Sequence, residues 1–233
     1  MLHGQWSNPS LISLRGRDVA LFGGGDGWLY ALEAANGREV WRFDGNAKDA
    51  VWCTGGDVPG KVFRNNIIAS PLVYENRIYL AMGQDPKHGQ GRGRVHAIDP
   101  GGQGDVTASR KLWETTDVGR TIATPIAHEG LLYVADFNSW VHCFETSTGK
   151  KVWEHDLFAG VWGCFLLADG KLYVGDEDGA MTIFAIGREK KVIGQIEMDA
   201  ALCAFAGVLY VASARRLYAL GLPKPADTVP ADR

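Results

Sequence analysis

The sequence lacks any long hydrophobic run and any block of like charge. Its longest uncharged apolar stretch, residues 200–214, falls short of the ~20 residues that cross a bilayer, and we expect it to form two buried strands and a turn. The 24 Lys and Arg and the 27 Asp and Glu are interspersed, with a net charge of -3. This balance provides no basic surface for a nucleic acid or an anionic membrane. The composition therefore gives no support for a membrane span or a nucleic-acid partner.

Closely spaced cysteines and a secretory signal are also lacking. The four cysteines show no C-x-x-C spacing, and residues 1–10 contain no charged segment followed by an apolar one. Because cysteine behaves as a small hydrophobe, we expect the three that lie in predicted strands to be buried free thiols, although a disulfide that the sequence cannot assign is the alternative. The cellular compartment is left open. These three are Cys143, Cys164 and Cys203, and the fourth is Cys53.

Glycine, in contrast, is abundant, with 30 of 233 residues, and much of it lies in turns between short apolar runs. Residues 120–156 show this organisation most clearly. Four runs rich in β-branched and aromatic residues are separated by Glu129-Gly130, Asn138-Ser139 and Thr148-Gly149. This pattern is typical of a four-stranded antiparallel meander.

The same unit recurs along the chain. Tyr133 and Tyr173, and separately Trp153 and Ile193, are 40 residues apart. A period of about 40 residues per four-stranded unit predicts an all-β fold, a β-propeller with four full blades and a partial fifth. The second copy carries insertions at 84–92 and 100–108. The expected blades span about 6–44, 67–114, 120–156, 160–197 and 200–221, followed by a Pro-rich tail at 222–233.

Runs such as Leu131–Ala135 are apolar on both strand faces, as expected for sheets packed between neighbouring blades. A β-sandwich, which buries one face of each sheet, is the alternative fold. Five units can close a small ring if the N-terminal segment supplies the missing outer strand, or they can form part of a larger propeller. We favour the incomplete ring, because residues 1–5 have little strand character and Trp6 already begins a strand.

A further motif repeats within the blades: an acidic residue, then a glycine, then a tryptophan. It spans 33–41 and 145–153, and appears more loosely as Asp99 with Trp113. This motif resembles the repeat of the pyrroloquinoline-quinone (PQQ) β-propellers, which include quinoprotein alcohol dehydrogenases and a scaffold lipoprotein of bacterial outer-membrane assembly. The tryptophan presents a flat face and one N–H to the adjoining blade. We therefore predict inter-blade docking, rather than ligand contact, for Trp41, Trp113 and Trp153.

The resemblance also has consequences for chemistry. Alcohol-oxidising members of this family carry a vicinal disulfide over PQQ, and carboxylate and amide groups that hold Ca²⁺ beside a catalytic aspartate. This sequence has no adjacent cysteines, and none of its aspartates maps onto that catalytic position. We therefore predict no catalytic and no metal-binding residue. PQQ with Ca²⁺ is implied by the resemblance alone, as is a periplasmic location if an N-terminal segment is missing.

A candidate ligand site lies where the first strands of the blades begin. Asn66 and Arg120 occupy one repeat position there, Trp162 lies close by in its own blade, and Trp52 and Arg64 are near in sequence. Such a polar and aromatic rim suits an anionic or planar ligand. In the alternative interpretation the arginines pair with loop carboxylates and Trp162 packs between blades.

The segment 83–93, which contains the insertion 84–92, is the most distinctive segment outside the repeat, and we interpret it as a recognition loop. Asp85 and His88 are spaced i, i+3 within it, but two ligands are too few to indicate a metal site. His96 and His142 occupy matching positions in the third strands of their blades, so we interpret them as serving the blade.

The sequence thus favours a non-catalytic binding or scaffold module that holds a protein or a small ligand at its loop faces. The alternative is a divergent or remnant PQQ-dependent oxidoreductase. A third hypothesis is a fragment without independent function, which would self-associate through exposed blade faces.

Overall fold

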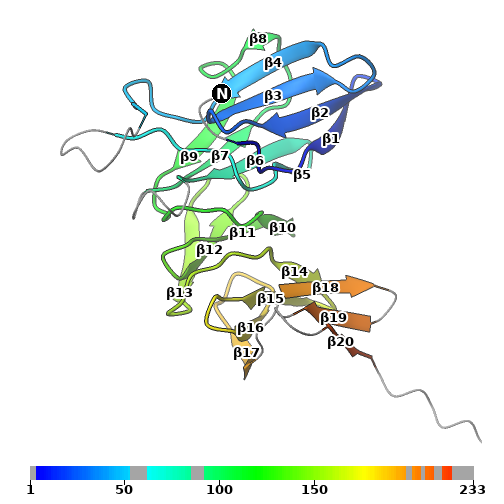
Figure 1. Ribbon diagram of the computed structural model, residues 1–233, viewed down its shortest axis with the longest axis vertical. Coiled ribbons are helices and arrows are strands. Elements are labelled where there is room, and N and C mark those ends of the chain that lie inside the picture. Colours follow the sequence, from blue (N-terminus) through cyan, green and yellow to red (C-terminus); the bar gives the residue numbers. More distant parts are fainter. Residues whose placement is uncertain are drawn as a thin grey trace, which may run out of the picture.

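A computed structural model describes residues 4–52, 62–84, 92–197, 201–205, 208–212 and 217–221. These residues form twenty strands in five sheets, numbered first to fifth along the chain (Figure 1). The first sheet has the order β1-β2-β3-β4-β8. Its strands are β1 (Ser10–Leu14), β2 (Arg17–Gly23), β3 (Trp28–Glu33), β4 (Glu39–Asp44) and β8 (Gly104–Asp105).

The remaining sheets repeat the antiparallel meander. The second comprises β5 (Leu72–Tyr74), β6 (Arg77–Met82), β7 (Arg94–Ile98) and β9 (Lys111–Thr115). The third comprises β10 (Ile126–His128), β11 (Leu131–Ala135), β12 (Trp140–Glu145) and β13 (Lys151–Asp156). The fourth comprises β14 (Leu166–Ala168), β15 (Lys171–Gly175), β16 (Ala180–Ala185) and β17 (Val192–Glu197). The fifth has three strands, β18 (Ala201–Phe205), β19 (Val208–Ala212) and β20 (Leu217–Leu220).

The motif glycine has two physical roles in the third sheet. Gly149 adopts a φ of 72°, which is a left-handed conformation that disfavours other residues. A Cβ atom at this position would also lie 2.6 Å from the Trp113 ring. In each of the first four sheets, moreover, the pairing of the third and fourth strands shifts register at the same place, for instance between Cys143 and Phe144. The bulge is therefore part of the repeat.

The hydrophobic core is divided into layers between the sheets. One buried cluster joins the first and second sheets through residues such as Leu29 and Leu80. A second joins Tyr79 to Val134 between the second and third sheets, and a third joins Tyr133 to Phe184 between the third and fourth. The inner strands of the second and third sheets are therefore buried on both faces, which explains their continuous apolar sequences.

The sheets follow one another in an open row, with the first and fifth at opposite ends (Figure 1). Strand β18 contacts β14 and β15 of the fourth sheet, whereas β1 pairs with β2 at the other end. The predicted all-β fold of four-stranded blades with a partial fifth is confirmed, and the ring is not closed. None of the described residues belongs to a helix long and apolar enough to cross a membrane.

The structure differs from the prediction in three local features. The first strands of the third and fourth sheets begin only at Ile126 and Leu166, because the preceding segments run as irregular backbone. Part of the insertion 100–108 forms β8, which pairs in parallel with β4. Because β14 begins at Leu166, Cys164 lies outside a strand and is exposed, contrary to the prediction, while Cys143 is free and buried as predicted. Burial raises the pKa of the Cys143 thiol to about 12.

Candidate functional site

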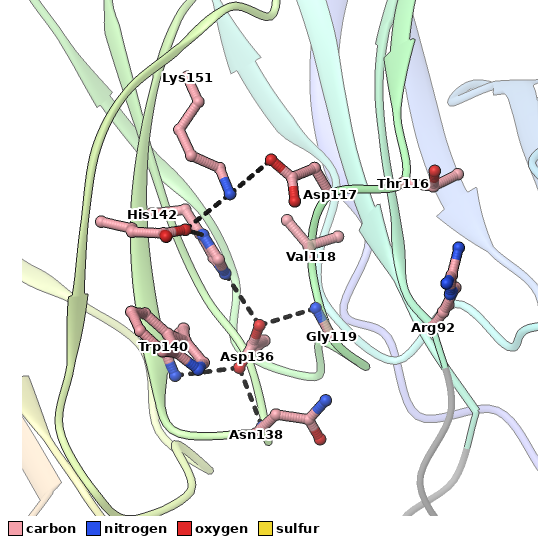
Figure 2. A pocket seen from close by; sticks show the side chains of 11 residues that line it. Arg92, Thr116, Asp117, Val118, Gly119, Asp136, Asn138, Trp140, His142 and Lys151 are labelled. Atoms are coloured by element: carbon pink, nitrogen blue, oxygen red, sulfur yellow. Dashed lines mark hydrogen bonds and ion pairs between the residues drawn. The ribbon is translucent and has the colours of Figure 1, made fainter.

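A polar pocket of about 470 Å³ opens between the third sheet and segment 116–119, which leads to it from the second sheet (Figure 2). The third and fourth strands of the third sheet form one wall, and Arg92 lies across the pocket on the opposite wall. The lining residues are Arg92, Thr116, Asp117, Val118, Gly119, Asp136, Asn138, Trp140, His142, Lys151 and Glu154.

The floor of the pocket is organised by Asp136, whose side chain is 1% exposed. Its Oδ2 accepts hydrogen bonds from the Gly119 backbone N–H at 2.7 Å and from His142 Nε2 at 2.9 Å. Its Oδ1 accepts from the backbone N–H groups of Asn138 at 2.9 Å and Trp140 at 3.0 Å. A buried carboxylate is costly unless donors surround it. These four donors therefore hold turn 137–139 and segment 116–119 against each other.

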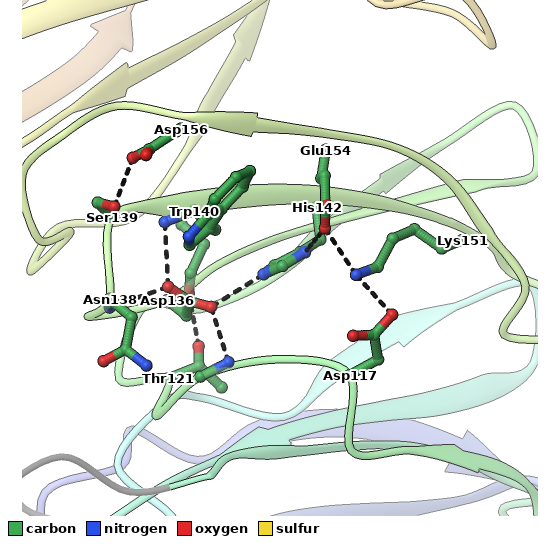
Figure 3. Close-up of polar contacts among 12 residues, drawn as sticks. Asp117, Thr121, Asp136, Asn138, Ser139, Trp140, His142, Lys151, Glu154 and Asp156 are labelled. Carbon is green, nitrogen blue, oxygen red and sulfur yellow. Dashed lines mark hydrogen bonds and ion pairs between the residues drawn. The ribbon is translucent and has the colours of Figure 1, made fainter.

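A second group of charged side chains lies beside His142 (Figure 3). His142 Nδ1 is 3.5 Å from Glu154 Oε2, and Lys151 Nζ is 2.7 Å from that oxygen and 2.6 Å from Asp117 Oδ2. Burial lowers the pKa of Lys151, but hydrogen bonds to Asp117 and Glu154 outweigh burial and the pKa is raised. Lys151 thus remains an ammonium ion that bridges β13 and segment 116–119.

The groups of the pocket suit the binding of a charged ligand, since an indole ring, carboxylates and cationic side chains line one cavity. Within the described ranges, no group of three or more His, Cys, Asp or Glu is placed to hold a metal ion. The sequence also contains no adjacent cysteines. The described residues therefore do not supply the Ca²⁺ ligand group, nor the sequence the adjacent cysteines, of the PQQ arrangement that the resemblance implied.

Two predicted rim residues, Arg120 and Trp162, meet at Phe137. The Arg120 guanidinium carbon is 5.4 Å from the Phe137 ring centroid, and the Trp162 ring meets Phe137 edge-on with centroids 4.8 Å apart. Arg120 is buried, while Trp162 is 54% exposed and donates from Nε1 to Glu177 Oε2 at 2.8 Å. Trp162 thus faces solvent rather than packing between sheets.

The other rim residues gather beside the first sheet. Arg64 forms an ion pair with Asp44 at 2.7 Å, and its guanidinium carbon is 5.5 Å from the Trp52 ring centroid. Asn66 is buried and donates from Nδ2 to the Gly25 carbonyl at 2.7 Å. The proposed rim is thus divided between two places in the fold. The recognition-loop residues Asp85 and His88 lie outside the described residues.

Each of the three predicted docking tryptophans donates its indole N–H to a carbonyl oxygen of the following sheet. The acceptor always lies in the connection between the third and fourth strands of that sheet. Trp41 donates to Pro100 at 2.8 Å, Trp113 to Thr146 at 2.8 Å and Trp153 to Gly187 at 3.0 Å.

The pocket itself was missed in the sequence analysis. Asp136 and Gly119 are 17 residues apart, and no local pattern indicates their contact. A signal was nevertheless present, because His142, Lys151 and Glu154 in the third blade correspond to His96, Lys111 and Glu114 in the second.

Comparisons with known proteins agree with this architecture. A PQQ-repeat family model described as outer membrane protein assembly factor BamB matches residues 91–190. Quinohemoprotein alcohol dehydrogenase of Comamonas testosteroni is 33% identical over 81 residues, which cover 30% of this chain and 11% of that protein.

Two solved structures share the fold. BamB from Moraxella catarrhalis has a TM-score of 0.66 at 20% identity, over 92% of this chain and 58% of that chain. The computationally designed Ika8 protein has a TM-score of 0.59 at 13% identity, over 88% of this chain and 54% of that chain. The chain therefore spans little more than half the length of these structures. Together with the acid–glycine–tryptophan motif and the tryptophan contacts, the matches show that residues 91–190 are similar to the PQQ-repeat β-propellers, which is the resemblance that the sequence predicted.

Proposed function

We propose that this chain is a non-catalytic scaffold that binds a protein partner through one end of its sheets. At this end, which we call the turn face, the second strand of each sheet turns into the third and the last strand leads to the next sheet. In the third and fourth sheets the turn face comprises 116–125, 137–139, 157–165 and 176–179.

The proposal depends above all on Phe158, in the connection between the third and fourth sheets. Its side chain is 86% exposed and its backbone has a φ of 65°, which is unusual for a bulky residue. The Phe158 N–H donates to Asp156 Oδ1 at 2.8 Å, and that oxygen also accepts from Ser139 Oγ at 2.5 Å. The chain therefore holds an aromatic ring in solvent at a conformational cost, and such strain is often retained at functional sites.

The distribution of exposed aromatic residues supports the same face. In the described part of the chain, Trp6 is 60% exposed and Trp162 is 54% exposed, and both lie, like Phe158, at the turn face. The other exposed large hydrophobic residues at strand positions are aliphatic and include Leu11, Leu112 and Leu217. Because exposed aromatic rings are frequent anchors of protein interfaces, the turn face is the favoured docking surface. The match to a model described as an assembly factor supports a scaffold role.

Site-specific photocrosslinking tests this proposal. A benzoylphenylalanine placed at 158 or 162 in cells of the source organism should give one discrete adduct with another protein. The same group at Leu112, which is 47% exposed on β9, should give none and serves as the matched control. Absence of adducts at both turn-face positions, or equal adducts at 112, would contradict the proposal. An adduct of two copies of this chain would instead support self-association.

The alternative function, PQQ-dependent oxidation, is favoured by the identity to quinohemoprotein alcohol dehydrogenase. It can be tested by adding PQQ and Ca²⁺, desalting, and assaying dye reduction with simple alcohols. Stoichiometric retention of quinone absorbance together with turnover would overturn the scaffold proposal.

A further inference from the structure

In each of the first three sheets, one side chain on the third strand and one on the fourth strand form a pair at corresponding positions. The pairs are Trp28 with Arg42, Arg94 with Glu114, and Trp140 with Glu154. In the first and third sheets the strand register places them as diagonal neighbours, because Tyr30 pairs with Arg42 and His142 with Glu154. The second sheet has the same register, with His96 opposite Glu114. Diagonal neighbours on one face of a sheet are within reach of long side chains.

In the first two sheets the chain supplies a guanidinium group to the pair. The Arg42 guanidinium carbon lies 5.2 Å from the Trp28 ring centroid, which is a cation–π contact. In the second sheet Glu114 Oε1 accepts from Arg94 Nη1, while Glu114 Oε2 accepts from Lys111 Nζ at 2.6 Å. Trp28 thus contacts an arginine of the first sheet, and Glu114 binds an arginine of the second sheet.

The third sheet combines the tryptophan of the first sheet with the glutamate of the second. Trp140 takes the place of Trp28, and Glu154 takes the place of Glu114. Glu154 Oε2 accepts from Lys151 at 2.7 Å, as Glu114 Oε2 accepts from Lys111. Within the part of the chain that the structure describes, Glu154 Oε1, which corresponds to the oxygen that Arg94 binds, takes part in no hydrogen bond or ion pair.

Both groups line the pocket of about 470 Å³ (Figures 2 and 3). The pocket carries three carboxylates and two cationic side chains, and the cation nearest to Glu154 is already engaged by two of those carboxylates. Arg92, the other cation, lies on the opposite wall. The Asp and Glu side chains of the lining therefore outnumber its Lys and Arg side chains by three to two, which favours a cation.

We propose that this pocket binds a guanidinium group, contributed by an arginine side chain of the protein partner. A guanidinium is planar, so it can stack on an indole ring while its N–H groups donate to a carboxylate. The pocket adjoins the turn face, because Asn138 lines it and the next residue, Ser139, accepts from the Leu157 N–H at 2.9 Å. The assignment to a protein partner rests on the proposed function, whereas the guanidinium chemistry rests on the repeat comparison.

Calorimetric titration with capped tripeptides tests the proposal. Acetyl-Gly-Arg-Gly-amide should bind saturably to the full chain, and the citrulline peptide, which is nearly isosteric and uncharged, should bind at least about tenfold more weakly because it lacks the charge-assisted contacts. Agmatine provides a small guanidinium without a peptide. A preference for the peptide would support a protein partner, and equal or tighter binding of agmatine would overturn the assignment to a partner protein in favour of a small guanidine ligand.

Two substitutions in the third sheet and one in the second complete the experiment. Glu154→Gln should weaken binding by about tenfold. Glu154→Arg should abolish binding, because it recreates the arginine over tryptophan seen in the first sheet. Glu114→Gln, on the pair already filled by Arg94, should leave the affinity unchanged. Melting temperatures of the three variants establish that each is folded.

The proposal is overturned if the citrulline peptide binds equally, if Glu154→Arg binds as the parent does, or if no guanidinium compound binds. Crosslinks from position 158 without arginine binding would refute this pocket and leave the proposed function intact. Arginine binding without crosslinks would support the pocket and refute docking at the turn face.

Discussion

At position 158 the backbone favours glycine and the sequence has phenylalanine. The φ of 65° costs a non-glycine residue about 1–2 kcal/mol. Because the ring is exposed, its burial within the chain offsets little of this cost. We expect Phe158→Gly to raise the free energy of unfolding by up to about 1 kcal/mol, since the added freedom of glycine in the unfolded chain offsets part of the gain. Urea denaturation measures the change.

Phe158→Ala is the control, because alanine keeps the strained φ and loses the ring. Both variants should lose the crosslinked adduct formed from position 162. Equal stabilities of the glycine and alanine variants would show that the φ at 158 carries no cost.

His96 is the residue from which a pH dependence is expected. Burial lowers its pKa to about 4, opposed by the Glu114 carboxylate and the hydrogen bond to the Gly45 carbonyl. Because the unfolded histidine has a pKa near 6.5, the unfolded state binds more protons between about pH 4 and 6.5. This histidine should therefore decrease the free energy of unfolding as pH falls through that window, by up to about 1.4 kcal/mol per pH unit.

The measurement is urea unfolding at several pH values, on the parent and on His96→Gln. The glutamine amide can still donate to the Gly45 carbonyl but does not titrate, so the variant should show a shallower slope between pH 4 and 6.5. Parallel slopes for the two proteins would rule out His96 as the source.

Among the structural elements, the turn after β11 depends most on one side chain. Asp136 accepts four hydrogen bonds from two segments while it is buried. Asp136→Ala leaves these donors without their acceptor, and the loss of such a buried network should lower the free energy of unfolding by about 3–5 kcal/mol. Chemical denaturation tests this value.

The matched control is Asp176, which follows β15 in the fourth sheet. Among the described residues, its Oδ1 accepts from the backbone N–H groups of Asp178 and Ala180 alone, and the residue is partly buried. Asp176→Ala should cost about 1 kcal/mol, as for the loss of a typical turn or capping bond. Equal costs for the two alanine variants would mean that the contacts to Gly119 and His142 contribute nothing.

Among the structural elements, the sequence predicted the strands better than the segments between them. The 40-residue spacing of Tyr133 and Tyr173 reflects an apolar strand pattern that recurs from blade to blade, and in the second and third sheets these strands are buried on both faces. The β8 pairing had no such signal, since Gly104 and Asp105 have no apolar periodicity and depend on β4, about 60 residues earlier. Cys164 was wrongly predicted to lie in a strand for a related reason. It belongs to an apolar run that precedes β14, and such a run need not be part of the strand.

The candidate site shows the same limit. Arg120 and Trp162, two residues of the predicted rim, both contact the ring of Phe137, which lies in a turn with no repeat signature. The pocket requires Gly119 to reach Asp136 across the fold. Sequence periodicity describes positions within a blade, whereas the pocket lies between blades.

For the whole molecule, the open row of sheets implies unequal local stability. The second and third sheets are covered on both faces by buried clusters, and β11 is buried along its whole length. Strand β17 is largely exposed, and the first sheet has a packed neighbour on one side only (Figure 1). In arrays of this kind each repeat gains stability from its nearest neighbours.

Hydrogen exchange with mass spectrometry should therefore show the slowest amides in β6, β11 and β12, which exchange through global unfolding, and faster amides in β1, β17 and β18–β20, which exchange through local opening. Trp153→Phe removes the N–H that bonds to the Gly187 carbonyl in the fourth sheet. It should accelerate exchange in β15 and β16 and leave β2 and β3 unchanged, because the contact lies at one interface. Uniform protection across all five sheets, or acceleration everywhere in the variant, would instead indicate a single cooperative unit in which the openness of the row has no consequence for stability.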